Sequence, residues 1–477
     1  MPSISGISLS QWRREMLRTN FWLMPSLEVL ASIALFSGTL EVDRAVYHGT
    51  LTLPAWVEAG SADTAREILL AVAAAIMTVI GINFSVTIVT LTLASTQFGP
   101  RMLRNFIRDR GTQLTLGTFV ATAVYCVLVL IAIGPAEHGV FVPHFSVSMV
   151  FLLVLVDLAV LIYFLHHIAI QIQLPFVIAA IANDLTRYLK VRNPDIRMAT
   201  GDQRDDPEEI AALIDTIESS GVMIPNPKGG YLQAIRYGML VRKVSAANAV
   251  VRLPYRPGNF MVEDRELAAV WPPGAADRVA HCLKRAQVTG PVRTLAQDPA
   301  FAIDQLVEIA IRALSPAVND TYTALACVDW LGNALCKLAR VWTPAQVYRD
   351  RAGAIRVICE QVSYENLVQR SFDKIRQASG GMPALLIREL DALTAIMEQT
   401  TDTDHARVLM DQAAMIQRAN LESVPEESDR ADVESRYSAA ARVYARLTDS
   451  TESYAQPEHG LHLAADPESE LSRGSEG

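Results

Sequence analysis

An aspartate inside a long apolar segment is the residue of this sequence best placed to do chemistry. Asp157 lies near the middle of the apolar span 147–165, and His167 and Gln171 follow it at i+10 and i+14 on the same helical face. An isolated charge at the centre of a bilayer costs about 2.5–3.5 kcal/mol, so this carboxylate needs a partner, a proton or water. We interpret the three residues as a polar path from mid-membrane to one membrane surface.

Polar side chains also recur at helical spacing on two other apolar segments. One face of the second segment, extended by a turn, carries Asn83, Thr87, Thr90 and Gln97. The third segment carries Thr115, Thr118 and Thr122 at i, i+3 and i+7. These stripes fit a water-lined path or proton relay, but they also fit plain helix packing, because Thr and Asn side chains bond across membrane helices. Both interpretations stay open.

Four apolar segments must position these side chains. They cover residues 22–40, 68–94, 114–133 and 147–165. Each approaches or exceeds the roughly 20 residues that a helix needs to cross a ~30 Å hydrocarbon core. The 477 residues are 51% hydrophobic and 19% charged with a net charge of -9, so an apolar front half precedes an acidic soluble half. The sequence predicts an integral membrane protein with four transmembrane helices.

The distribution of arginines predicts the orientation of these helices. Arg13, Arg14 and Arg18 precede the first span, and four arginines lie between residues 101 and 110. The connections on the other side are acidic or, in residues 134–144, free of Lys and Arg. By the positive-inside rule, the N-terminus and the C-terminal half are therefore expected in the cytoplasm.

A basic amphipathic helix is expected over residues 101–110, after the helix-interrupting pair Gly99-Pro100. Arg101, Arg104 and Arg108 would lie along its polar side. Arginines at this depth contact anionic lipid headgroups or attract anions to a pore mouth. The alternative is that they only fix the topology.

Two motifs resemble a known family. The first is the run 90–101, Thr-Leu-Thr-Leu-Ala-Ser-Thr-Gln-Phe-Gly-Pro-Arg, followed by Arg108-Asp109-Arg110-Gly111. The second runs from Arg293-Thr294 through Gln297-Asp298-Pro299-Ala300-Phe301 to Asn319-Asp320, with Thr321 where the family pattern has proline. Together they resemble the bacterial predicted membrane proteins called domain of unknown function 2254. The resemblance extends to about residue 420 and implies a protein of the bacterial inner membrane, but no reaction.

The soluble half divides into four regions. Residues 174–220 are expected to form a connecting helix and an acidic linker, and residues 449–477 a disordered acidic tail. Five short strand-like runs within 221–275 predict a small β-barrel or sandwich. Residues 276–448 are expected to be mainly helical, so the soluble half is an α+β region.

One group of polar residues in the soluble half invites an enzymatic interpretation. Its members are Arg293, Asp298, Asp304, Arg312, Asn319 and Asp320. Carboxylates there would serve as an acid, a base or a metal ligand, but helix capping and salt bridges explain the same residue types. The sequence has no H-E-x-x-H, P-loop or G-x-S-x-G pattern, no closely spaced cysteine pair and no basic surface with interleaved aromatics. We therefore expect no metal, no cofactor, no nucleic acid and no catalysis.

Three functions remain under consideration. The first is a homo-oligomeric conduit for ions or small solutes, assembled or gated by the cytoplasmic domain, with lipids as its other partners. The second is a membrane-anchored scaffold or signalling protein with a non-catalytic interaction domain. An enzyme is the third. A continuous polar interior would favour the first, and a tightly packed bundle would favour the second.

Overall fold

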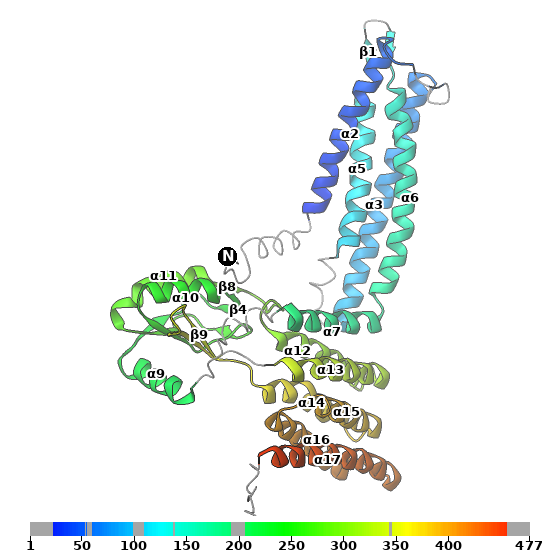
Figure 1. Cartoon of the computed structure of the whole chain (residues 1–477). Helices are drawn as coiled ribbons and strands as arrows, with labels where there is room; N and C mark the ends of the chain where they lie inside the picture. The colour runs from blue at the N-terminus through cyan, green and yellow to red at the C-terminus, as the bar shows by residue number, and fades with distance from the viewer. Residues whose placement is uncertain are drawn as a thin grey trace, which may run out of the picture.

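A computed structural model describes residues 22–52, 54, 60–98, 109–136, 139–191, 206–342 and 346–455. Figure 1 shows a long bundle of four helices at one end of the molecule. A stack of shorter helices continues from the lower end of this bundle, and a smaller α+β unit lies beside the stack. The C-terminal part is mostly helical with some sheet structure, as expected from the sequence.

The bundle consists of α2 (Leu23–Tyr47), α3 (Ala62–Phe98), α5 (Arg110–Ala132) and α6 (His144–Gln171). All four helices are long and apolar enough to cross a membrane, which confirms the four predicted apolar helices. They extend beyond the predicted spans because the apolar runs stop at the first charges, whereas α2 continues past Glu41 and Asp43. Helix α5 packs against each of the other three and has the largest buried share.

Short connections complete the bundle. A small antiparallel hairpin, β1 (Gly134–Ala136) with β2 (Gly139–Phe141), joins α5 to α6. The expected basic helix over 101–110 lies outside the described residues up to position 108, and Arg110 is already the first residue of α5.

Helix α7 (Leu174–Val191) links the bundle to the soluble part. Two residues separate it from the end of α6, and it lies across the lower end of the bundle (Figure 1). Its apolar side, with Ile178, Ile181 and Leu185, is buried in the core of the soluble stack. Because α7 packs on α12 and α13, α6 is connected through a two-residue link to a helix that belongs to the stack.

The soluble stack is made of three helix pairs in successive layers. These are α12 (Pro299–Ala313) with α13 (Thr321–Val341), α14 (Tyr364–Ser379) with α15 (Pro383–Met397), and α16 (Thr403–Ser423) with α17 (Glu427–Ala455). Their apolar faces form one continuous core. Since α17 runs to Ala455, the tail expected to be disordered from residue 449 still belongs to a helix there, and residues 456–477 lie outside the described part.

The α+β unit has two open sheets and three helices. One sheet has the order β3-β7-β5-β10-β9 and the other the order β6-β4-β8. The strands are β3 (Val222–Pro225), β4 (Gly230–Ile235), β5 (Val250–Leu253), β6 (Phe260–Met261), β7 (Glu266–Trp271), β8 (Gln287–Gly290), β9 (Val347–Arg349) and β10 (Ile355–Cys359). The helices are α9 (Pro207–Ser220), α10 (Tyr237–Ala246) and α11 (Ala276–Ala286), and a short 3-10 turn, Pro273–Ala275, precedes α11.

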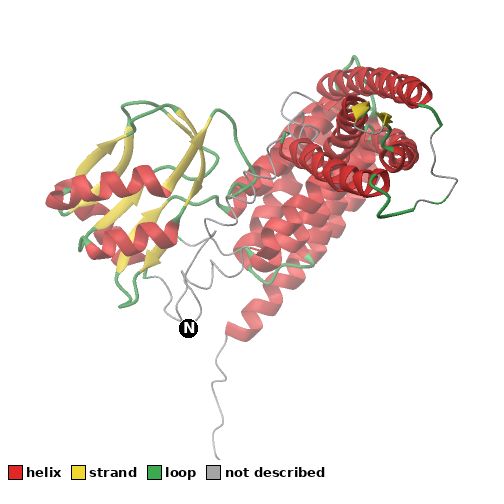
Figure 2. Ribbon diagram, turned by 90° about the horizontal axis from the view of Figure 1, so that it is seen from above, coloured by secondary structure: helices red, strands yellow, loops and turns green. Residues whose placement is uncertain are grey.

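The predicted β-barrel is wrong, because neither sheet closes on itself in the described residues. Helices cover the larger sheet instead, with α9 in the core of one face and α10 and α11 in the core of the other (Figure 2). The sheet also takes in β10, which pairs in parallel with β5, Val357 opposite Val251. The strands are therefore not confined to residues 221–275, and part of the expected acidic linker forms α9.

Candidate functional site

Asp157 is buried between α6 and α5 at mid-bundle. The residue is 4% exposed, and its Oδ1 accepts a hydrogen bond from Thr122 Oγ1 on α5 at 3.1 Å. The same hydroxyl lies 3.1 Å from the carbonyl oxygen of Thr118, so its single proton serves one acceptor at a time. Oδ2 has no hydrogen-bond partner among the described residues. Asp157 is therefore a weakly held carboxylate in an apolar setting.

His167 and Gln171 lie together at the lower end of the bundle, beside the start of α5. Nε2 of His167 lies 2.9 Å from Asp109 Oδ2 and 2.7 Å from Gln171 Nε2. A protonated Nε2 donates to Asp109, whereas an unprotonated Nε2 accepts from the Gln171 amide. The protonation state of this nitrogen therefore selects between the two contacts.

Two neighbours fix the position of the His167 ring. Tyr163 stacks on it with ring centroids 5.3 Å apart, and a Cβ at Gly111 would lie 2.5 Å from its Nε2. Asp109 is held in turn as the N-cap of α5, accepting from Thr112 N at 2.8 Å and Thr112 Oγ1 at 3.0 Å. Helical spacing did not reveal Asp109 or Gly111, but both belong to the first family-like motif.

Glu28 lies at a level between this cluster and Asp157. Its Oε2 accepts from Thr118 Oγ1 at 3.2 Å, and its carboxylate covers Gly117 so closely that a Cβ there would collide with it. The stripe Thr115, Thr118 and Thr122 therefore faces both α2 and α6. It contacts one carboxylate from each of these helices.

The upper end of the bundle holds a second buried carboxylate. Asp43 at the end of α2 accepts from Phe145 N at 2.7 Å, Ser146 N at 3.0 Å and Ser146 Oγ at 2.6 Å. It thereby caps the N-terminus of α6 across about a hundred residues of sequence. The hydroxyl of Tyr125 on α5 lies 2.8 Å from Thr39 Oγ1 and also interacts with Ser146.

The predicted stripe on α3 has a different character. Thr87 and Thr90 donate to backbone carbonyls of α3 itself, those of Asn83 and Val86. Asn83 is 4% exposed, and its Nδ2 has no partner among the described residues. The side chain of Gln97 and all of Arg101, Arg104 and Arg108 lie outside the described part of the chain.

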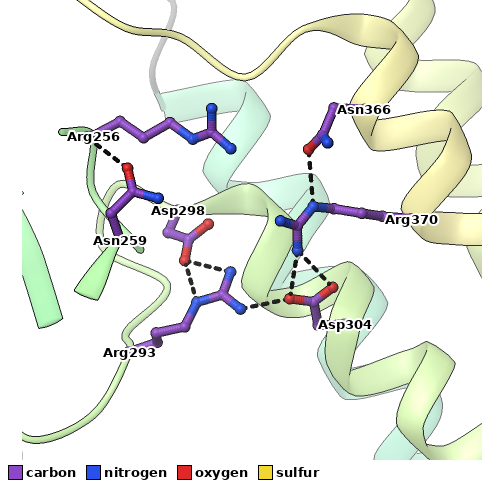
Figure 3. Close-up of polar contacts among 7 residues, drawn as sticks. All are labelled: Arg256, Asn259, Arg293, Asp298, Asp304, Asn366 and Arg370. Atoms are coloured by element: carbon purple, nitrogen blue, oxygen red, sulfur yellow. Dashed lines mark hydrogen bonds and ion pairs between the residues drawn. The ribbon is translucent and has the colours of Figure 1, made fainter. Parts of the chain in front are cut away.

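The soluble polar group separates into two places. Three of its members meet at the start of α12, where Arg293 donates to Asp298 at 2.8 Å and to Asp304 at 2.5 Å (Figure 3). Arg370 of α14 donates to Asp304 at 3.1 Å and to Asn366 at 2.8 Å. Arg370 and Asn366 were missed in the sequence, because some 70 residues separate them from the motif.

This cluster joins the α+β unit to the stack. The turn at Gly258, with φ +100°, lies directly against the Asp298 carboxylate, and Gln297 hydrogen-bonds both backbone groups of Ile235. Burial raises the pKa of Asp298, and the Arg293 guanidinium opposes that rise. Burial also opposes the charge on Arg293, but Asp298 and Asp304 outweigh it and raise the pKa of Arg293. The arrangement is that of an ion-paired joint.

The remaining members lie at the other end of α12. Asp320 caps α13 by accepting from Thr323 N at 3.1 Å and Thr323 Oγ1 at 2.6 Å. Asn319 adopts the left-handed conformation with φ +52°, and Arg312 lies in the last turn of α12. Within the residues that the structure describes, no three His, Cys, Asp or Glu side chains gather as metal ligands.

Comparison with known proteins identifies the family. Residues 18–395 match the family described as "Predicted membrane protein (DUF2254)". Uncharacterized proteins of Mycobacterium bovis and of Mycobacterium tuberculosis strain H37Rv are each 31% identical over 461 residues, covering 92% of this chain and 84% of the relative. No solved structure matches the chain. The family resemblance of the two sequence motifs is thus confirmed, and the chain belongs to the predicted membrane proteins of domain of unknown function 2254.

Proposed function

We propose that this protein is a multi-pass conduit for ions or small solutes in the bacterial inner membrane, with its N-terminus and soluble half in the cytoplasm. The observation that carries the proposal is Asp157, which is buried at mid-bundle with Oδ2 unpartnered among the described residues. A carboxylate at this depth is costly, and such residues commonly mark ion or proton pathways. Its neighbours Thr122, Thr118 and Glu28 extend the polar surface along α5.

The soluble half supplies a route for gating in this proposal. Helix α6 carries Asp157 and His167 and passes after two residues into α7, which packs on α12 and α13. A shift of the stack would therefore move α6 relative to α5. We further propose that copies of the chain associate, because four helices rarely enclose a path alone. Native mass spectrometry of the purified protein in lipid tests this: a homo-oligomer is expected, and a monomer would contradict it.

Flux through reconstituted vesicles tests the conduit. Wild-type protein is expected to pass at least one of H⁺, K⁺, Na⁺ and Cl⁻ faster than empty vesicles. Asp157→Asn should lower that flux while keeping the fold, since the amide is similar in size and neutral. The matched control is Thr92→Val, which changes an exposed hydroxyl of α3 that bonds only to its own backbone, at Ile88. Well-folded wild-type protein with no flux of any of these ions would contradict the proposal.

A membrane-anchored scaffold is the second candidate. The layered helix pairs and a surface groove of about 320 Å³ between α13 and α15 favour it, since the groove offers charged side chains such as Asp329, Arg388 and Asp391 to a partner. In a scaffold, loss of the Asp157 charge would affect assembly and leave no flux to lose. An enzymatic role for Asp298 and Asp304 is less favoured, because arginines already hold both carboxylates.

A further inference from the structure

We propose that the species carried is the proton, relayed by side chains along α5 within each copy of the chain. The inference rests on the proposed conduit function and names its substrate. It follows from the polar contacts of α5, which run from one end of the helix toward the other and join ionisable groups at four levels.

The relay groups are closely spaced along the helix. From the lower end, α5 presents Thr112 to Asp109, Thr118 to Glu28, Thr122 to Asp157 and Tyr125 to Thr39. At 1.5 Å of rise per residue, the steps from Thr118 to Thr122 and from Thr122 to Tyr125 are about 6 and 5 Å. Thr115, which is buried and one turn below Thr118, lies in the longer interval beneath Glu28.

Both ends of this series have an ionisable group. At the lower end, Nε2 of His167 changes its contact from Gln171 to Asp109 when it takes up a proton. At the upper end, the Tyr125 hydroxyl interacts with Ser146, whose own hydroxyl donates to Asp43 at 2.6 Å. Each hydroxyl in the series can donate one hydrogen bond and accept another, which is what proton transfer requires.

The packing favours a proton over a larger ion. Thr118, Thr122 and Tyr125 of α5 each contact a side chain of α2 or α6 directly. Apolar side chains such as Phe119, Val129 and Val150 are buried in the same bundle core. A metal cation needs about six oxygen ligands or its hydration shell. Asp157 has a single described hydrogen-bond donor, Thr122, and the orphan Oδ2 is free to carry a proton.

The transfer balances without any other reactant. A proton enters or leaves through His167 at the lower end and through the hydroxyls of Ser146 and Tyr125 at the upper end, while Asp43 keeps its charge. Asp157 then alternates between carboxylic acid and carboxylate as O–H bonds form and break along α5. One proton leaves at the opposite surface for each that enters, and no group is oxidised or reduced.

An acid jump applied to vesicles holding a pH-sensitive dye tests the relay, with the membrane potential clamped by K⁺ and valinomycin. Wild-type protein should acidify the lumen faster than empty vesicles. Asp157→Asn should return the rate to that of empty vesicles, and Tyr125→Phe, which keeps the ring, should slow it by about tenfold. Thr92→Val is the matched control and should match the wild type. Melting curves and gel filtration establish that each variant is folded.

The outcomes separate this inference from the conduit itself. Flux of K⁺, Na⁺ or Cl⁻ without proton flux would overturn the proton relay and leave the conduit standing. No flux of any ion would overturn both. Proton flux that is unchanged in folded Asp157→Asn and Tyr125→Phe would overturn the path along α5. If Asp157→Asn does not fold, the acidification rate of Tyr125→Phe tests the path along α5. An unchanged rate in this variant would overturn that path.

Discussion

Two buried carboxylates of the bundle, Asp43 and Asp157, and the partly buried Asp109 are held in different ways. Asp43 and Asp109 each accept backbone N–H bonds at a helix start, so their charge has a fixed structural use. Asp157 lies within a helix, away from any helix end, and receives one described hydroxyl bond. Gaining a proton would cost Asp43 or Asp109 several contacts, but it costs Asp157 little. This difference is why the proposed relay assigns the change of protonation state to Asp157.

Gly117 tests the close packing of α5 against α2. A Cβ at this position would lie 2.9 Å from the Cα of Pro25 and would collide with the Glu28 carboxylate. Gly117→Ala is therefore expected to lower the melting temperature in detergent by several degrees, because backbone atoms must separate. At Gly81 a Cβ would meet nothing within 4 Å, so Gly81→Ala should leave the melting temperature unchanged. Equal melting temperatures for the two variants would show that α2 and α5 are not in this contact.

Glu389 in α15 predicts a pH-dependent stability of the stack. The side chain is fully buried, and neither carboxylate oxygen has a partner among the described residues. Burial raises the pKa of Glu389 well above its ordinary value, while Arg376 opposes the rise and Asp373 adds to it. The folded chain thus keeps a proton that the unfolded chain releases above roughly pH 4.3, so stability falls as pH rises from there, by up to about 1.4 kcal/mol per pH unit.

Glu389→Gln should remove this loss. Between pH 5 and pH 8, the wild type is expected to lose more melting temperature than the variant, and the variant should be the more stable of the two at pH 8. Glu422→Gln, on the exposed surface of α16, is the control and should follow the wild type. Parallel curves for wild type and Glu389→Gln would contradict the burial argument.

Between elements, the ion-paired joint around Arg293 is expected to stabilise the fold more than an exposed ion pair does. Arg293→Ala would leave Asp298 charged, buried and without its guanidinium, at a cost of about 3–5 kcal/mol. The Arg388 and Asp329 side chains are 43% and 49% exposed. Breaking this ion pair in Arg388→Ala should therefore cost about 0–1 kcal/mol. Urea unfolding followed by circular dichroism compares the two. A similarly small loss of unfolding free energy in both variants would mean that the joint contributes little to stability.

The strands of the α+β unit could be predicted from the sequence, but their pairing could not. The five strands expected within 221–275 form near their predicted positions, because short β-rich runs between turns are a local signal. The pairing partners of these strands lie far away in the sequence. Strand β5 pairs with β10 about a hundred residues later, and nothing in the sequence around Val251 predicts that it lies opposite Val357. Helix α10 was missed between those strands, and with it part of the helical cover of the larger sheet. Helix α11 lies in the region 276–448 that was expected to be mainly helical. Loops were also misjudged where α9 and α17 extend into acidic segments.

In the bundle, the sequence likewise predicted individual residues but not their contacts between helices. Depth in an apolar run pointed to Asp157, and helical spacing pointed to the Thr118 and Thr122 face. Which helix that face meets depends on the rotation and tilt of each helix, which a single sequence does not give. Asp109 and Asp43 are recognisable only through their contacts with His167 and Ser146, far away in the chain.

For the whole molecule, the proposed cytoplasmic orientation predicts which residues an impermeant reagent reaches. Single cysteines at Thr50, in the exposed connection after α2, and at Lys228, in an exposed turn of the α+β unit, should lie on opposite sides of the membrane. An impermeant maleimide added to spheroplasts should label Thr50→Cys and not Lys228→Cys. The wild type controls for its five native cysteines, four of them buried. The reverse labelling pattern would invert the orientation.

Proton conduction is tested by the current across a planar bilayer that contains purified protein, with a pH gradient as the only ion gradient. The wild type should give a current whose reversal potential follows the proton gradient, and this current should be lost in Asp157→Asn but kept in Thr92→Val. The contradicting result is folded wild-type protein with no current above the bare bilayer, or a current that Asp157→Asn leaves unchanged.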